Sequence, residues 1–174
     1  MTDDNICGEM IALGIGSNLG DSRAIILGAI KSLTERINRI RISSFYRSEP
    51  MYVVDQPFFI NAVVVGCYSG DANELLAFVQ SIEYRFGRTR TRPKGERTLD
   101  IDILLFGKKI IDNPPTLTVP HPEMRERRFV LVPLLELEPE LLDPLTGKSY
   151  QKLLCALPVQ GIYYHGSASY NPSQ

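Results

Sequence analysis

The sequence has no tryptophan, two histidines and only three cysteines. Cys7, Cys67 and Cys155 are far apart, and no Cys-x-x-Cys pair occurs, so we expect neither a structural zinc site nor a disulfide framework. No apolar run approaches the length of about 18 residues that a membrane span needs. The first ten residues, MTDDNICGEM, lack the basic and apolar stretches of a secretory signal. These absences favour a protein of a reducing compartment, and we expect it to be cytoplasmic.

A strong net charge is also absent, since 19 basic and 20 acidic residues leave a net charge of -1. A nucleic-acid-binding domain is usually basic, so we expect no nucleic acid partner and no membrane partner. The 174 residues, 44% of them hydrophobic, suit one globular domain. We expect a single domain over residues 1–174, with its core at about 10–150, and a monomer.

Hydrophobic periodicity predicts the order strand, helix, strand, strand, helix, strand. The expected strands cover residues 10–15, 41–47, 58–68 and 99–106; the expected helices cover 22–37, capped by Asp21 or Ser22, and 72–86. This order is typical of an α+β fold, a ferredoxin-like βαββαβ sandwich. A C-terminal extension follows, with a turn at His121, a helix start around Glu123, a short helix at 150–154 and an unstructured tail at about 165–174.

The most informative stretch is GERTLDIDILL, residues 95–105, where Asp100 and Asp102 interrupt an apolar strand. Residues two apart on a strand point to the same face, so the two carboxylates should lie side by side. Burying such a pair requires compensation by a divalent cation, by Arg97, or by both. The alternative is a solvated edge strand on which the two aspartates pair with Arg97 or Arg88.

Two groups of cations accompany the aspartates. Residues 85–97 contain six, interrupted by two glycines and a proline, which predicts a mobile cationic loop suited to a polyphosphate: Arg85, Arg88, Arg90, Arg92, Lys94 and Arg97. A second group of candidate phosphate ligands follows the prolines near residue 120: His121, Arg125, Arg127 and Arg128.

Two further features have alternative interpretations. The glycines at 16 and 20 could present backbone amides to an anion, or they could form a simple turn. Asn61, the polar residue within an apolar strand, could recognise a ligand or bond to neighbouring backbone.

Several sequence blocks in the right order resemble the 6-hydroxymethyl-7,8-dihydropterin pyrophosphokinase family, from about residue 10 to 150. The blocks are GIGSNLGD at 14, SSFYRSEP at 43, DQPFFINAVV at 55, IEYRFGRTR at 82, GERTLDIDILLFG at 95 and LTVPHPEMRERRFVLVPL at 117. The resemblance implies transfer of the β,γ-diphosphate of ATP to the hydroxymethyl group of the pterin, with release of AMP. It also implies that two Mg²⁺ ions take part.

The same resemblance assigns roles to individual residues. Asp100 and Asp102 would bind the metal and, with Arg88 and Arg97, act in catalysis. Residues implied around ATP are Glu83, Arg88, Arg97, Ile103, His121 and Arg127. Residues implied around the pterin are Ser48, Glu49, Pro50, Met51, Phe59, Asn61, Asp100 and Phe129, with the two phenylalanines stacking on the ring. Ser17 and Asn18 would close the pterin pocket.

The chain departs from some members of the family at two positions. Lys94 replaces an aromatic residue, in a loop that is one residue shorter, and Pro122 replaces a tyrosine after the histidine. Both positions concern ATP binding and loop closure. Two other classes fit parts of the pattern. An RNA-binding module would need a basic charge and spaced aromatic residues that are absent here, and a Mg²⁺-dependent nucleotidyltransferase would release pyrophosphate instead of AMP.

Overall fold

The computed structural model describes residues 8–51, 55–87 and 95–168. In this part of the chain, an antiparallel sheet runs in the order β5-β1-β4-β3-β8, and β2 pairs with β4 next to β3. Its strands are β1 (Glu9–Ser17), β2 (Asn38–Ile42), β3 (Phe45–Ser48), β4 (Phe59–Tyr68), β5 (Asp100–Phe106) and β8 (Ile162–Gly166).

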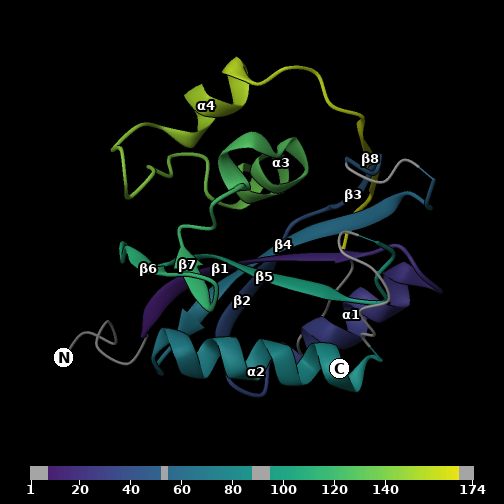
Figure 1. Cartoon of the computed structure of the whole chain (residues 1–174), viewed down its shortest axis with the longest axis horizontal. Helices are drawn as coiled ribbons and strands as arrows, with labels where there is room; N and C mark the ends of the chain where they lie inside the picture. The colour runs from purple at the N-terminus through teal and green to yellow at the C-terminus, as the bar shows by residue number, and fades with distance from the viewer. Residues whose placement is uncertain (1–7, 52–54, 88–94, 169–174) are drawn as a thin grey trace.

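Two helices cover one face of this sheet, α1 (Ser22–Leu33) and α2 (Ala72–Arg85) (Figure 1). Asp21 caps α1 by accepting a hydrogen bond from the N–H of Ala24, and Asp71 and Glu74 form a capping box on α2. The Asp21 carboxylate thus occupies one of the N–H groups at the start of α1, and both interpretations of the glycine-bounded turn before it stay predictions. The βαββαβ order confirms the ferredoxin-like fold.

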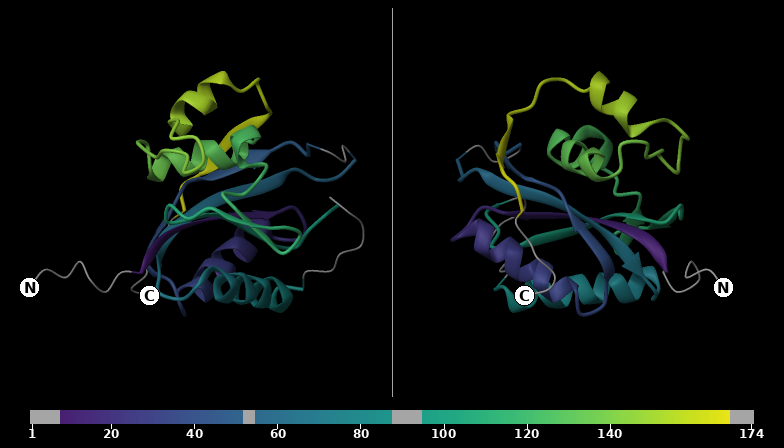
Figure 2. Two further views of the ribbon diagram at one scale, coloured as in Figure 1. Left: turned by 60° about the vertical axis from the view of Figure 1, so that its left-hand side comes forward. Right: turned by 180° about the vertical axis from the view of Figure 1, so that it is seen from behind.

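The C-terminal half of the chain covers the opposite face of the sheet (Figure 2). Leu104, Met124, Leu131 and Tyr150 belong to a second buried cluster on this side. The elements here are the 3-10 helix η2 (Met124–Glu126) and the helices α3 (Arg128–Leu137) and α4 (Tyr150–Ala156). The hairpin of β6 (Ile111–Asn113) and β7 (Leu117–Val119) instead buries Leu117 and Val119 in the cluster beneath α1 and α2.

The central strand β1 explains why the two faces differ. Ile11, Leu13 and Ile15 point into the core beneath α1 and α2, whereas the alternate positions on the α3 side include Gly14 and Gly16. A Cβ at residue 16 would lie 3.2 Å from Oδ1 of Asn61, and one at residue 14 would lie 3.4 Å from the Leu104 side chain. Glycine at these positions therefore leaves room on the face toward α3.

Three expected boundaries need correction. The strand expected at 41–47 is divided into β2 and β3 at Ser43, whose N–H donates to Val63 O and whose hydroxyl accepts from Val63 N–H, each at 2.9 Å. The helix expected to reach residue 37 ends at Leu33. The tail expected to be unstructured from about 165 is wrong for its first residues, because β8 extends to Gly166; residues 169–174 lie outside the described part.

The cysteines also differ from expectation. Cys67, in β4, is disulfide-bonded, and its partner lies outside the described residues. Cys155, in α4, is free and exposed. The sequence analysis argued against a disulfide framework and did not predict this single bond, since separation along the sequence does not show which cysteines lie close in space. No helix in the described part of the chain is long and apolar enough to cross a membrane.

Candidate active site

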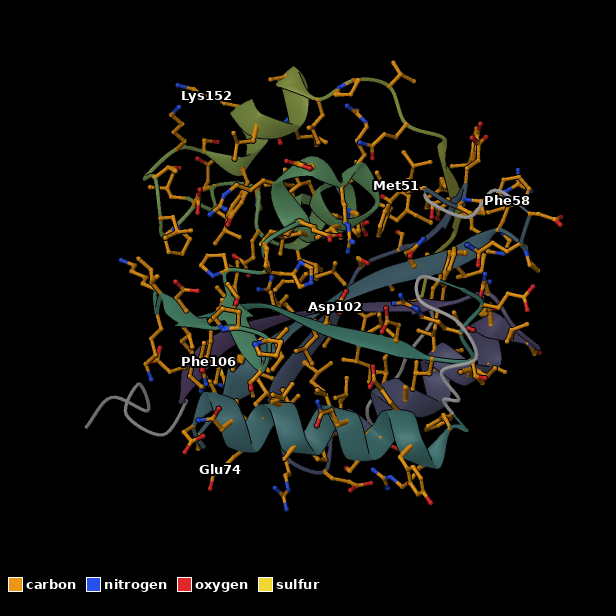
Figure 3. The ribbon with its side chains drawn as sticks, in the orientation of Figure 1. Met51, Phe58, Glu74, Asp102, Phe106 and Lys152 are labelled. Atoms are coloured by element: carbon orange, nitrogen blue, oxygen red, sulfur yellow. The ribbon has the colours of Figure 1, made fainter. Side chains whose placement is uncertain are left out.

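A cavity of about 290 Å³ lies between the sheet and the start of α3. Asp102 points into this space from β5 (Figure 3). The residues expected from the sequence that line the cavity are Ser48, Glu49, Met51, Phe59, Asn61, Arg97, Asp100, Asp102, His121, Arg127 and Phe129. The fold thus brings together residues from β3, β4, β5, the segment after β7 and α3.

The carboxylates of Asp100 and Asp102 lie on one face of β5, opposite Gly16 and Gly14 of β1. Arg97 forms an ion pair with Asp100. Asp102 Oδ2 lies 3.9 Å from Nη1 of Arg127 and 3.8 Å from Nε2 of His121. The predicted carboxylate pair is therefore present and faces the cavity with cationic groups beside it.

These charges change how readily the neighbouring groups ionise. Burial and the negative charge of Asp100 raise the pKa of Asp102, against the opposing effect of Arg127 and Arg97. Burial and the positive charge of Arg127 lower the pKa of His121 to about 4. Nδ1 of His121 accepts a hydrogen bond from the N–H of Glu123 at 3.3 Å, so the neutral ring carries its proton on Nε2, toward Asp102.

The residues present fit a magnesium ion that is completed by a substrate. Among the residues with described positions, no group of three or more His, Cys, Asp or Glu side chains could hold a metal by itself. Mg²⁺ commonly binds to one or two carboxylates and takes its other ligands from water and substrate phosphates. Two adjacent carboxylates, one with a raised pKa, meet that requirement because a cation would relieve their mutual repulsion.

Glu83 and Ile103 contribute in ways that their sequence context did not show. The buried carboxylate of Glu83 accepts a 2.7 Å hydrogen bond from the N–H of Ile101, between the two aspartates. The side chain of Ile103 lies in the core beneath α1 and α2, not in the cavity. Backbone groups two residues apart on a strand point the same way, so those of Ile103 face the open edge of β5 with the Ile101 N–H. Any contact of Ile103 with ATP would come from its backbone.

The cavity is also lined by the rings of Phe59 and Phe129. Asn61 lines it as well, is 6% exposed and donates from Nδ2 to the Ser48 hydroxyl at 2.8 Å. The two interpretations of Asn61 are thus compatible, since it bonds to a neighbour and also lines the cavity. Pro50 lines an adjacent hollow and not this cavity.

Ser17 and Asn18 lie behind the cavity wall and do not line it. Asn18 Oδ1 accepts from the N–H of Arg97 at 2.8 Å, and its own N–H donates to Arg97 O at 3.1 Å. Its Nδ2 donates to Gln56 and to Pro57 O. Ser17 donates to the hydroxyl of Ser22. Asn18 therefore holds the backbone of Arg97 against the connection between β3 and β4.

Two of the predicted phosphate ligands face elsewhere. Arg125 makes two hydrogen bonds to the buried carboxylate of Asp143, and Arg128 donates to the carbonyls of Leu154 and Leu157. Both arginines thus fasten the C-terminal segments to one another. Arg88 and the rest of the predicted mobile loop, residues 88–94, lie outside the described residues.

The sequence analysis missed three features of the cavity. Gln56 and Glu123 line it, and Glu123 forms an ion pair with Arg127. The position of Glu123, four residues before Arg127, could have suggested this pair. Gly14 forms part of the wall, and its place on the same face of a strand as Gly16 was the available signal.

Comparison with known proteins decides the family. A sequence model of the 7,8-dihydro-6-hydroxymethylpterin-pyrophosphokinase family matches residues 12–139. This chain belongs to that family. A 2-amino-4-hydroxy-6-hydroxymethyldihydropteridine pyrophosphokinase of Pseudomonas aeruginosa is 40% identical over 157 residues, which cover 88% of this chain and 95% of that protein. A protein of the same name from Haemophilus influenzae is 42% identical over 134 residues, covering 76% and 83% of the two chains.

Other members of the pyrophosphokinase family are longer. The folic acid synthesis protein fol1 of Pneumocystis carinii is 41% identical over 149 residues, which are 85% of this chain but 20% of that protein. A crystal structure of a Plasmodium falciparum HPPK-DHPS triple mutant superimposes with a TM-score of 0.70 and 16% identity, covering 88% of this chain and 44% of that one. The chain thus spans only part of these two relatives, and the second supports the fold alone.

Proposed function

We propose that this chain transfers diphosphate from ATP to the hydroxymethyl group of 6-hydroxymethyl-7,8-dihydropterin and releases AMP. The observation that carries the proposal is that one cavity combines two kinds of lining. They are a carboxylate pair with arginines, called the nucleotide end below, and an amide with two aromatic rings, called the pterin end. Family membership and the names of the two bacterial relatives support the same reaction.

The pterin end suits a flat heteroaromatic ring with polar edges. Stacking between Phe59 and Phe129 contributes about 0.5–1.5 kcal/mol beyond the burial of area. Asn61 and the backbone of residues 48–51 would bond to the edge of the ring, and such a site rejects analogues that lack the matching groups. These side chains therefore select the substrate and orient its hydroxymethyl group toward the aspartates.

The nucleotide end suits a triphosphate. Arg97, Arg127 and His121 would hold its oxygens by charge-assisted hydrogen bonds. Mg²⁺, bound to Asp100 and Asp102, would neutralise charge on the phosphate oxygens. In the reaction the hydroxyl oxygen forms a bond to the β-phosphorus, the bond from that phosphorus to the α–β bridging oxygen breaks, and AMP leaves. Asp102, which lines the cavity beside Asp100, is the candidate to accept the hydroxyl proton.

Four finer statements belong to the same proposal. Two Mg²⁺ ions take part, because two adjacent carboxylates can share a pair of ions about 3.5–4 Å apart. The chain acts as a single pyrophosphokinase domain, as a monomer and in the cytoplasm. Titration with Mn²⁺ in the presence of a non-hydrolysable ATP analogue tests the metal count, with two equivalents expected and one contradicting it.

Product analysis tests the reaction itself. The chain is incubated with Mg²⁺, the hydroxymethyl pterin and ATP that carries a label on its γ-phosphate. We expect AMP and labelled pterin diphosphate in equal amounts. Label in free pyrophosphate would indicate a nucleotidyltransferase, and label in free phosphate would indicate an ATPase; either result contradicts the proposal.

A further inference from the structure

Gln160, in the connection from α4 to β8, makes two hydrogen bonds that enclose one residue of the active site. Its Oε1 accepts from the N–H of Arg128 at 2.9 Å, and its Nε2 donates to the carbonyl of Glu126 at 2.7 Å. These backbone groups lie on either side of Arg127. One side-chain amide from a distant segment thus gives a hydrogen-bond partner to both backbone groups.

The Arg127 backbone bonds to its neighbours, since its N–H donates to Met124 O at 3.4 Å and its carbonyl accepts from Leu131 N–H at 3.0 Å, but α3 has no capping side chain at this point. Arg127 is the N-cap residue of α3, has extended dihedral angles (φ -113°, ψ 105°) and makes no side-chain capping bond. The N–H of Arg128 is one of the first donors of the helix, which have no partner within the helix itself. Gln160 supplies the acceptor that a capping side chain would otherwise provide.

The side chain of Arg127 depends on this backbone position. Its Nε is buried and has no hydrogen-bond partner among the described residues, and its guanidinium lies 3.9 Å from Asp102 and 5.6 Å from the centre of the Phe129 ring. The guanidinium is paired with Glu123, four residues earlier in the same segment, so the two side chains move together with this backbone relative to Asp102. A shift of about 1 Å in the backbone would therefore move the guanidinium relative to a bound triphosphate, and displacements of this size can reduce turnover strongly.

The same segment also supports the opposite wall of the cavity. The carbonyl of Gly161 accepts from the N–H of Glu49 at 3.0 Å, and the hydroxyl of Tyr163 bonds to the Glu49 carboxylate at 3.2 Å. Ile162 pairs with Ser48, next to the pterin end of the cavity. Figures 1 and 2 show this path, in which the chain leaves α4, passes α3 and descends to the sheet edge as β8.

A second hollow of about 230 Å³ shares part of its wall with the active-site cavity. Its lining includes Pro50, Met51, Phe129, Val159 and Ile162. Phe129 packs against the second buried cluster, and Ser48 is held by Asn61 and by its pairing with β4. The hydrogen bonds from residues 160–163 add a restraint on the side of the wall that faces the hollow.

We propose that Gln160 is a positioning residue for Arg127 and Phe129, and that residues 160–163 hold the cavity in the shape needed for both substrates. The proposal rests on the proposed diphosphate transfer. In this proposal the C-terminal segment affects turnover through the positions of Arg127 and Phe129, and Gln160 itself does not touch the reacting atoms.

The test compares Gln160→Leu, which removes both hydrogen bonds, with Gln160→Glu, which keeps the acceptor for Arg128 N–H and loses the donor. Gln151→Leu, on the exposed surface of α4, is the matched control. We expect kcat to fall about tenfold in Gln160→Leu, by an intermediate factor in Gln160→Glu, and not at all in the control. Because the substrates still reach the cavity, the pterin KM should change less than kcat.

Circular dichroism and the melting temperature show whether each variant folds, and hydrogen exchange reports on the backbone without any substrate. We expect the amide of Arg128 to exchange at least tenfold faster in Gln160→Leu, with unchanged exchange in the core of β1 and β4. Unchanged kcat and KM in a folded Gln160→Leu would overturn the proposal. If the unaltered chain has no transferase activity, the proposed function fails, and the exchange comparison decides alone: an unchanged Arg128 amide would then overturn the positioning role.

Discussion

The carboxylate of Glu83 accepts a 2.7 Å hydrogen bond from the backbone N–H of Ile101, the residue between Asp100 and Asp102. Glu83 comes from α2 and the aspartates from β5, so one buried side chain links the helical layer to the strand that carries the carboxylate pair. Within the described part of the chain, the start of β5 is at the edge of the sheet, where β1 is its single strand neighbour. Glu83 therefore replaces part of the restraint that a second neighbouring strand would give.

We predict that Glu83→Ala lowers both stability and turnover. The variant leaves the Ile101 N–H without this acceptor, which costs about 1–3 kcal/mol when the group stays buried. Glu83→Gln keeps an oxygen acceptor and should lose less of each. Urea unfolding and steady-state kinetics measure the two effects. If the alanine and glutamine variants behave alike, the hydrogen bond to Ile101 is not what matters at this position.

For the carboxylate pair, we predict that Asp102→Asn reduces turnover by at least about a hundredfold without lowering the free energy of unfolding at pH 7. The charge is needed to bind Mg²⁺ with the triphosphate, whereas in the free protein its removal relieves repulsion from Asp100. Asp100→Asn should reduce turnover similarly. Near-normal turnover in either variant would mean that the aspartates serve only as partners of Arg97 and Arg127.

The stacking interaction predicts a selective loss of pterin binding. Phe59→Ala and Phe129→Ala should each weaken pterin binding about tenfold and change nucleotide binding little, because each removes one aromatic face. Phe58→Ala is the control, since Phe58 is 46% exposed, stacks under Arg47 and does not line the cavity. Calorimetry with each ligand measures the effect, and equal losses for both ligands would assign the two rings to the core.

The ion pair between Arg125 and Asp143 predicts how stability depends on pH. Burial opposes ionisation of Asp143, but hydrogen bonds from Arg125, Thr146 and Leu145 outweigh it and lower its pKa to about 2. Compared with the pKa of an ordinary aspartate, this lowering contributes about 2 kcal/mol to the free energy of unfolding. Because the pKa is lower in the folded state, this stability is present above about pH 4 and is lost as the pH falls toward 2.

Asp143→Asn should therefore destabilise the protein by about 2 kcal/mol at pH 7 and by much less at pH 2.5. Asp112→Asn, an exposed position on β6, carries the same change of charge and serves as the control. Unfolding in urea at both pH values measures the difference. A destabilisation of equal size at both pH values would show that the packing of the Asp143 side chain, and not its charge, stabilises the protein.

Local sequence determined much of the fold. The period of two along β5 puts Asp100 and Asp102 on one face, as expected from residues 99–106 alone. The caps at Asp21 and Asp71 could also be predicted, because capping acts within one turn of a helix. The family resemblance then supplied the residues around the cavity that periodicity alone could not select, such as Phe59 and Phe129.

The tertiary structure decided which of several equivalent residues faces the cavity. Arg125, Arg127 and Arg128 are nearly adjacent in sequence, yet of the three only Arg127 approaches Asp102. Asp143 binds Arg125, and two carbonyls at the end of α4 bind Arg128. Likewise, residues 162–166 have no strong pattern of their own and form β8 because the edge of β3 offers partners. Sequence periodicity fixes the face of an element on which a side chain lies, but its partner depends on segments tens of residues away that only folding brings together.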